Sequence, residues 1–183
     1  MNDEQKKTLL KIVRKVIEAT VKGQPVGTIE ADDPVFKERR GCFVTIHNHG
    51  RLRGCIGQFQ PQSSLLDIAC DMARAATRDS RFIMDPVTEA ELPKIDIEVS
   101  VLSPLEPVDD PLSLELGRHG IYIQRGNRAG CFLPQVATET GWGKEEFLSQ
   151  CCAGKAGLPA DAWKDPDTTV YLFTAAVFGE KDY

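Results

Sequence analysis

Residues 42–57 alternate apolar and polar side chains on both sides of a central turn, and this pattern restricts the fold of the chain most strongly. Successive side chains of a strand point to opposite faces, so a β-hairpin over these residues has one apolar face and one polar face. Asn48-His49-Gly50 is the predicted loop, because a three-residue connection favours Gly in a left-handed conformation. The alternation therefore predicts that the hairpin belongs to a sheet whose apolar face packs against a hydrophobic core.

The register of this hairpin follows from the loop. The predicted pairs are His47 with Arg51, Thr45 with Arg53, and Phe43 with Cys55. The apolar face then consists of Cys42, Val44, Ile46, Leu52, Gly54 and Ile56. The polar face carries Phe43, Thr45, His47, Arg51, Arg53 and Cys55. A one-residue slip would mix the two sets, so the pattern favours this sorting of side chains.

The rest of the chain mixes helices and strands irregularly. Helical periodicity predicts helices over residues 5–21, 65–77, 134–140 and 144–156. Alternation and turn signals predict strands over 95–102, 121–123, 129–133 and 168–178. We expect an α+β fold of mostly antiparallel sheets flanked by helices, in one domain over 1–183 with two lobes. The proline-rich, acidic stretch 104–111 starts the expected lobe boundary, near 104–120.

Composition excludes several classes of protein. The 183 residues carry a net charge of −5, which counts against a nucleic-acid-binding module. No apolar run approaches the roughly 20 residues of a membrane helix, and the polar start is no signal peptide. The six cysteines form no zinc-type pair, so we expect a cytoplasmic protein with reduced thiols. The absence of a G-x-G-x-x-G motif and a P-loop gives no sign of a nucleotide cofactor, and none is predicted.

Several segments resemble the AMMECR family, which is named for a human chromosomal region. The segments are Gly41–Thr45, Leu52–Gly57, Asp79–Phe82, Ile97–Leu102, His119–Ile121, Leu133–Ala137, Gly141-Trp142 and Lys155–Leu158. The resemblance extends over nearly the whole chain, from about Leu9 to Phe178, and the Leu52–Gly57 motif is its most specific part. It implies a compact α+β fold with a larger and a smaller lobe. Family members often occur beside, or fused to, a Memo-like protein and a radical-SAM protein, and the resemblance implies no particular reaction.

Cys55 is the candidate nucleophile. On the predicted polar face it lies near Arg51 and Arg53, and nearby cations favour a thiolate. Gly54 and Gly57 leave room for a ligand or a second backbone to approach. The alternative is that Leu52–Gly57 is a packing motif in which Cys55 is a small buried apolar residue.

Charged residues elsewhere suggest a site for a small anionic ligand. Arg53 and Arg81 can bind a carboxylate or phosphate, or each can pair with an acid such as Asp79 or Glu98. Glu98 projects from the polar side of a strand, as a general base or as the acid that holds Arg53.

Two further groups have side chains of the kinds that bind ligands. Gln135 follows Pro134 at a helix start, where it could meet an anion or cap the helix. His47, His49 and Cys55 do not converge into a recognisable ligand set, so no metal site is predicted.

Three functions remain open at this point. The first is an enzyme or carrier that uses Cys55 in a cleft around Arg53-Gly54-Cys55. The second is a non-catalytic adaptor that docks a Memo-like or radical-SAM partner. The third, a nucleic-acid-binding module, is disfavoured by the acidic charge.

Overall fold

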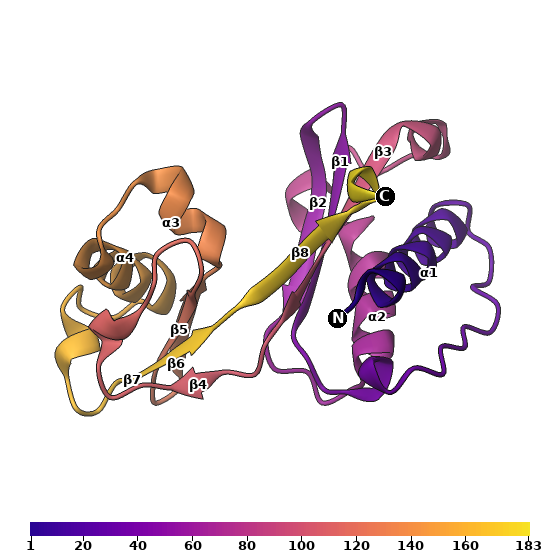
Figure 1. Cartoon of the computed structure of the whole chain (residues 1–183). Coiled ribbons are helices and arrows are strands. Elements are labelled where there is room, and N and C mark those ends of the chain that lie inside the picture. Colours follow the sequence, from indigo (N-terminus) through magenta and orange to yellow (C-terminus); the bar gives the residue numbers. More distant parts are fainter. The chain divides into compact units, whose positions relative to one another are not determined.

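The structure is a computed structural model that describes residues 1–183. The chain forms two compact units, one of Met1–Leu102 with Ala176–Tyr183 and one of Ser103–Ala175. Each unit contains a four-stranded sheet, and the strand pairs β1–β2, β1–β3, β4–β7, β5–β6 and β5–β7 are antiparallel. The predicted α+β class with antiparallel sheets is therefore confirmed (Figure 1).

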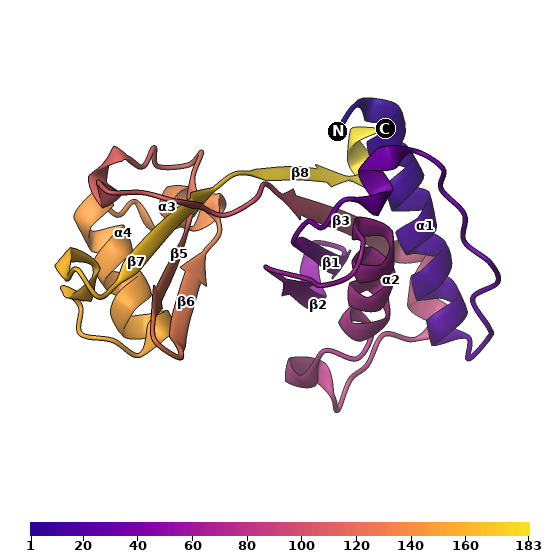
Figure 2. The ribbon, with the colours of Figure 1, turned by 90° about the horizontal axis from the view of Figure 1, so that it is seen from below.

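The first unit is a sheet with two long helices on one face. Its strands, in spatial order, are β2 (Arg51–Gln58), β1 (Cys42–Asn48), β3 (Ile95–Leu102) and β8 (Ala175–Gly179). The helices are α1 (Asp3–Val21) and α2 (Leu65–Ala76), which lie on the same side of the sheet in Figure 2. The core of this unit joins Val13 and Ile17 of α1 and Ala69 of α2 to Val44 and Val99 of the strands. The opposite sheet face carries the polar residues of the alternation.

Side-chain caps start both long helices, α2 at the predicted Leu65 and α1 at Asp3, two residues before its predicted start. Asn2 and Gln5 form a capping box at α1, in which each side chain bonds the other residue's backbone N–H. The Ser64 hydroxyl accepts a hydrogen bond from the Asp67 backbone N–H at the start of α2.

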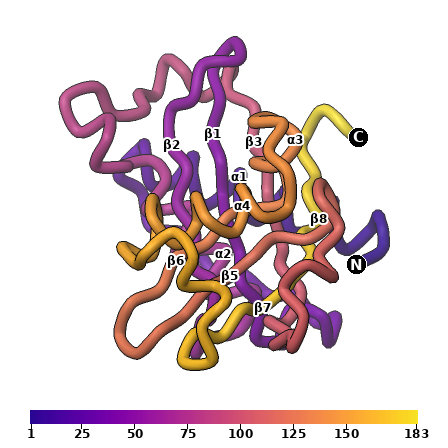
Figure 3. The backbone as a smooth tube through the Cα atoms, turned by 90° about the vertical axis from the view of Figure 1, so that its left-hand side faces the viewer, coloured from indigo at the N-terminus to yellow at the C-terminus, as the bar shows by residue number.

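The β1–β2 hairpin corrects the predicted register. The turn contains two residues, His49 and Gly50, both with positive φ, where three were predicted. The observed pairs are Phe43 with Gly57, Val44 with Ile56, Thr45 with Cys55, and Ile46 with Gly54. The predicted partners of Phe43 and Thr45 were wrong by two residues, and that of His47 by one, because a bulge separates Ile46–Gly54 from His47–Leu52. A shift of two keeps each side chain on its face, so the sorting of Cys55 and Thr45 to the polar face holds. The two strands of the hairpin run side by side in Figure 3.

The second unit has its own sheet and core. Its strands, in spatial order, are β4 (Glu106–Pro107), β7 (Thr169–Phe173), β5 (Gly120–Arg125) and β6 (Arg128–Phe132). Its α-helices are α3 (Pro134–Thr140) and α4 (Lys144–Cys151). The predicted helix 144–156 is divided, because α4 passes into a π-helical turn, Cys152–Ala156, before Gly157 ends it at φ 64°. The predicted strand 168–178 is wrong as a single strand, because β7 belongs to one sheet and β8 to the other.

Short 3₁₀ turns complete the chain. They are Pro34–Lys37, Ser80–Phe82, Glu89–Lys94, Pro111–Ser113, Ala162–Lys164 and Glu180–Asp182. All six cysteines are free. No helix has both the length and the apolar character that crossing a membrane requires.

Candidate functional site

Cys55, Thr45 and Glu98 form a row across three strands. Thr45 of β1 is opposite Cys55 of β2 on one side and Glu98 of β3 on the other. The Thr45 hydroxyl, Oγ1, donates a hydrogen bond to Cys55 Sγ at 3.2 Å. The Glu98 carboxylate takes part in no hydrogen bond or ion pair. The row lies on the sheet face opposite α1 and α2, since its residues alternate with the core residues Val44 and Ile97.

The backbone of Cys55 is held at the edge of the sheet. The Cys55 N–H donates to Asp79 Oδ2 at 2.9 Å, and Arg81 Nη2 donates to the Cys55 carbonyl at 3.1 Å. Arg81 also binds Asp79, with 2.6 Å between Nη2 and Oδ2, and this bond holds the pKa of the Asp79 carboxyl well below its ordinary value. Because β2 is an edge strand, the Asp79–Arg81 pair takes the hydrogen bonds that a further strand would take. The pair therefore fixes the position of Cys55.

Arg53 does not share the surroundings of Cys55. Its side chain is 4% exposed, and the guanidinium donates to Glu91 Oε1 at 2.7 Å and to Asp85 Oδ2 at 3.0 Å. A further donor reaches the Pro86 carbonyl at 3.2 Å. The bulge redirects this side chain, because Glu91 also accepts from Asn48, a residue of the core-facing parity. The predicted placement of Arg53 beside Cys55 is therefore wrong.

The partner of Arg53 was not evident from the sequence. Glu98 was one expected acid, but Glu91 and Asp85 hold the guanidinium, and Glu98 is left without a partner. The bond from Arg53 lowers the pKa of Glu91 to about 2. The only local signal at Glu91 is a capping box with Thr88, which indicates a helical turn but not a distant arginine.

The remaining predicted ligand residues have separate surroundings. A Cβ on Gly54 would lie 2.0 Å from the Ala76 carbonyl oxygen, and one on Gly57 would lie 2.1 Å from the Phe43 ring. Both glycines are thus in contact with protein. Arg51 is 71% exposed, with Asp85 at 3.5 Å. Gln135 lies in the first turn of α3 in the second unit, where its carbonyl accepts from Thr138 Oγ1.

The cysteines differ in environment. Burial raises the pKa of Cys42 to about 12 and that of Cys131 to about 11, and it also raises the pKa of Cys70, Cys151 and Cys152. Cys55 is partly exposed. No group of three or more His, Cys, Asp or Glu side chains is placed to hold a metal ion.

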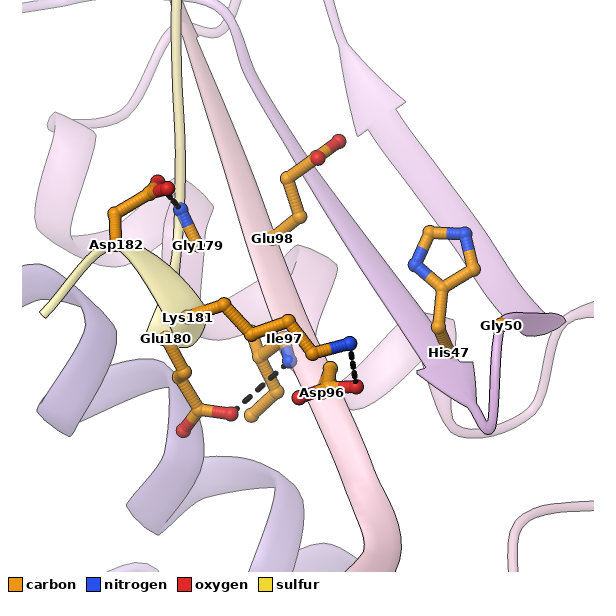
Figure 4. A pocket seen from close by; sticks show the side chains of 9 residues that line it. All are labelled: His47, Gly50, Asp96, Ile97, Glu98, Gly179, Glu180, Lys181 and Asp182. Atoms are coloured by element: carbon orange, nitrogen blue, oxygen red, sulfur yellow. Dashed lines mark hydrogen bonds and ion pairs between the residues drawn. The ribbon is translucent and has the colours of Figure 1, made fainter.

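A pocket beside the row was not predicted. It has a volume of about 350 Å³ and is lined by His47, Gly50, Asp96, Ile97, Glu98 and Gly179–Asp182 (Figure 4). Glu98 belongs both to this pocket and to the row with Cys55. The pocket could not be read from the sequence, because the C-terminal residues reach it only through the pairing of β8 with β3.

The chain is an α+β domain with two four-stranded sheets, the class that the sequence motifs suggested. A family model described as AMMECR1 matches residues 10–178, and the chain belongs to this family. The predicted resemblance is therefore confirmed.

Relatives of similar length are known from archaea. A protein of Methanothermobacter thermautotrophicus is 45% identical, over 98% of this chain and 96% of the relative. Protein TK0174 of Thermococcus kodakarensis is 41% identical, over 99% of this chain and 93% of the relative. The crystal structure of the uncharacterized protein PH0010 from Pyrococcus horikoshii matches with a TM-score of 0.86 and 37% identity, over 99% of this chain and 94% of that one. The names of these relatives state no reaction.

Proposed function

We propose that this domain is a thiol-dependent enzyme or carrier in which Cys55 is the nucleophile. The observation that carries the proposal is the hydrogen bond from Thr45 Oγ1 to Cys55 Sγ. A donor aimed at sulfur stabilises the charged thiolate more than the neutral thiol. A partly exposed thiol of this kind has the access and the activation that a nucleophile needs.

The neighbouring groups support a covalent step. The thiolate would attack the electrophilic carbon of an activated acyl group, forming a C–S bond while the bond to the leaving group breaks. Cys55 would react as the thiolate that Thr45 stabilises, its proton having passed to water, and water would protonate the leaving group. The products are a thioester on Cys55 and the protonated leaving group.

Arg81 is the cation best placed for a small anionic ligand. Its side chain is 55% exposed, and the guanidinium bonds to Asp79 and to the Cys55 carbonyl use Nε and Nη2, so Nη1 makes no hydrogen bond. Arg53, in contrast, is covered and occupied by two carboxylates. We therefore assign the anion-binding role to Arg81 in this proposal.

Alkylation of each cysteine by iodoacetamide at pH 7, followed by peptide mass spectrometry, tests the proposal. We expect Cys55 to react at least about tenfold faster than the buried Cys42 and Cys151. Thr45→Val should slow the alkylation of Cys55 by about tenfold, since a hydrogen bond to a charged group contributes about 1.5–3 kcal/mol. Thr28→Val, at an exposed threonine of the same unit, is the matched control and should change nothing.

Two outcomes would reject the thiol proposal. One is a Cys55 that stays unreactive until the protein unfolds, which would make it a packing residue. The other is an unchanged rate in Thr45→Val, which would show that the hydroxyl does not activate the sulfur.

A second candidate function, docking of a Memo-like or radical-SAM partner, is favoured by one observation. Ile83 is 72% exposed and Met84 is 93% exposed, directly after the turn that holds Cys55. Adjacent exposed apolar side chains of this size are typical of an interaction site. If docking occurs here, Met84→Asp should abolish co-purification of such a partner while leaving Cys55 alkylation unchanged. Retained co-purification would reject this surface.

A further inference from the structure

The pocket beside Glu98 is built from three segments of the first unit. The hairpin end contributes His47 and Gly50, β3 contributes Asp96–Glu98, and the C-terminal turn contributes Gly179–Asp182. In Figure 4 the His47 and Glu98 side chains project from neighbouring strands, and no interaction joins either of them to another lining residue. The volume of about 350 Å³ is within the range of small-molecule sites.

Most charges around this pocket are already compensated. Lys181 forms an ion pair with Asp96. Glu180 accepts from Arg14 Nε at 2.8 Å and from the Ile97 N–H at 3.0 Å. Asp182 Oδ2 accepts from the Gly179 N–H at 2.7 Å, which ties down the C-terminal turn.

Glu98 is the exception among these groups. It is partly buried, lines the pocket and has no hydrogen-bond or ion-pair partner. A carboxylate that is removed from part of its water and left unpaired is costly, and a cation from solution would offset that cost. The ring of His47, also without a partner, supplies a second polar group at the same opening.

We infer that this pocket binds the primary ammonium group of a small amine ligand, with Glu98 as the counter-ion. An ammonium group is compact and has three donors, which suits one carboxylate and neighbouring acceptors such as the His47 ring nitrogen and Asp182 Oδ1. A simple anion would meet Glu98 without compensation, because Lys181 is engaged by Asp96. This inference goes beyond the thiol chemistry and does not depend on it.

Backbone amide chemical shifts during titration with n-butylammonium and with butyrate test the inference. The two probes have similar apolar chains and opposite charges. We expect saturable shifts at Gly50, Ile97 and Gly179 with butylammonium, and at least tenfold weaker binding of butyrate.

Three variants make the test directional. Glu98→Gln should weaken butylammonium binding at least tenfold, and because Glu98 has no partner to lose, the variant should fold normally. Lys181→Met should strengthen binding severalfold, since it frees Asp96. Glu89→Gln, the same charge change at an exposed position outside the pocket, is the control and should leave binding unchanged.

The inference is overturned if butyrate binds as tightly as butylammonium, if neither probe gives saturable shifts, or if Glu98→Gln has no effect. Cys55→Ser separates this inference from the proposed thiol chemistry. It should abolish alkylation at position 55 and leave butylammonium binding intact.

Discussion

Gly54→Ala is expected to lower the free energy of unfolding of the first unit by about 3–4 kcal/mol, near the upper end for overpacking. The added Cβ would lie 2.0 Å from the Ala76 carbonyl oxygen and 2.9 Å from its carbonyl carbon. These are backbone atoms at the end of α2, so the clash cannot be relieved by a side-chain rotation. Relief requires α2 to move away from β2, which opens the core between them.

Differential scanning calorimetry measures this effect, and a fall in Tm of about 10 °C is expected for a chain of this size. Gly27→Ala is the matched control, because nothing lies within 4 Å of its Cβ position and its φ is not positive. A Gly54→Ala protein as stable as the wild type would contradict the close approach of α2 to β2.

Arg53→Met is expected to lower the free energy of unfolding by about 3–5 kcal/mol, the usual range when one member of a buried ion pair is removed. The substitution leaves Glu91, whose side chain is 19% exposed, without its main partner. Arg51→Met in the same strand should change stability by less than about 0.5 kcal/mol, since Arg51 is 71% exposed. Urea unfolding of both variants provides the comparison.

The pH dependence of the free energy of unfolding gives a second measure of the Arg53–Glu91 ion pair. Arg53 lowers the pKa of Glu91 to about 2 from an ordinary value of 4.5. The ion pair therefore stabilises the folded protein fully above pH 4.5, and this stabilisation is lost as the pH falls towards 2. The stability difference between wild type and Arg53→Met should therefore narrow on acidification. Adding Glu91→Gln to Arg53→Met should restore part of the lost stability, because no unpaired carboxylate remains. A constant difference from pH 7 to pH 3 would contradict the pairing.

These predictions divide the Leu52–Gly57 motif by role. Gly54 admits α2, Gly57 lies under Phe43, and Arg53 ties the sheet to the Glu89–Lys94 turn through Glu91. Cys55 is the member whose side chain projects to the polar face, where Thr45 donates to it. The Leu52–Gly57 motif therefore combines residues that pack or pair within the fold with one candidate nucleophile, Cys55.

Local periodicity was sufficient for most of the helices and strands and for the faces of the strands outside the bulge. The strand Ile95–Leu102 has the predicted limits, and α2 begins at Leu65 as predicted, whereas α1 begins at Asp3, two residues before the predicted start. Cys55 and Thr45 lie on the polar face as expected, because the twofold alternation of a strand depends only on its own residues.

The pairing of strands and the contacts between distant residues could not be predicted in the same way. The register of the hairpin differs by two residues because alternation is unchanged by a shift of two, and the bulge at Arg53 depends on contacts with a distant turn. The division of residues 168–178 between two sheets follows from strand pairing, which no local pattern encodes.

The sequence by itself thus determined the α+β class, the two long helices, the face of the sheet on which Cys55 lies, and Cys55 as the residue of interest. Only the tertiary structure decided that Arg53 pairs with Glu91 and that Thr45 and Glu98 lie in one row with Cys55. It also decided that the C-terminal turn lines a pocket at Glu98. The physical reason is the range of the interactions. Periodicity and capping act within a few residues, whereas ion pairs, register and pockets join segments that meet only after the chain has folded.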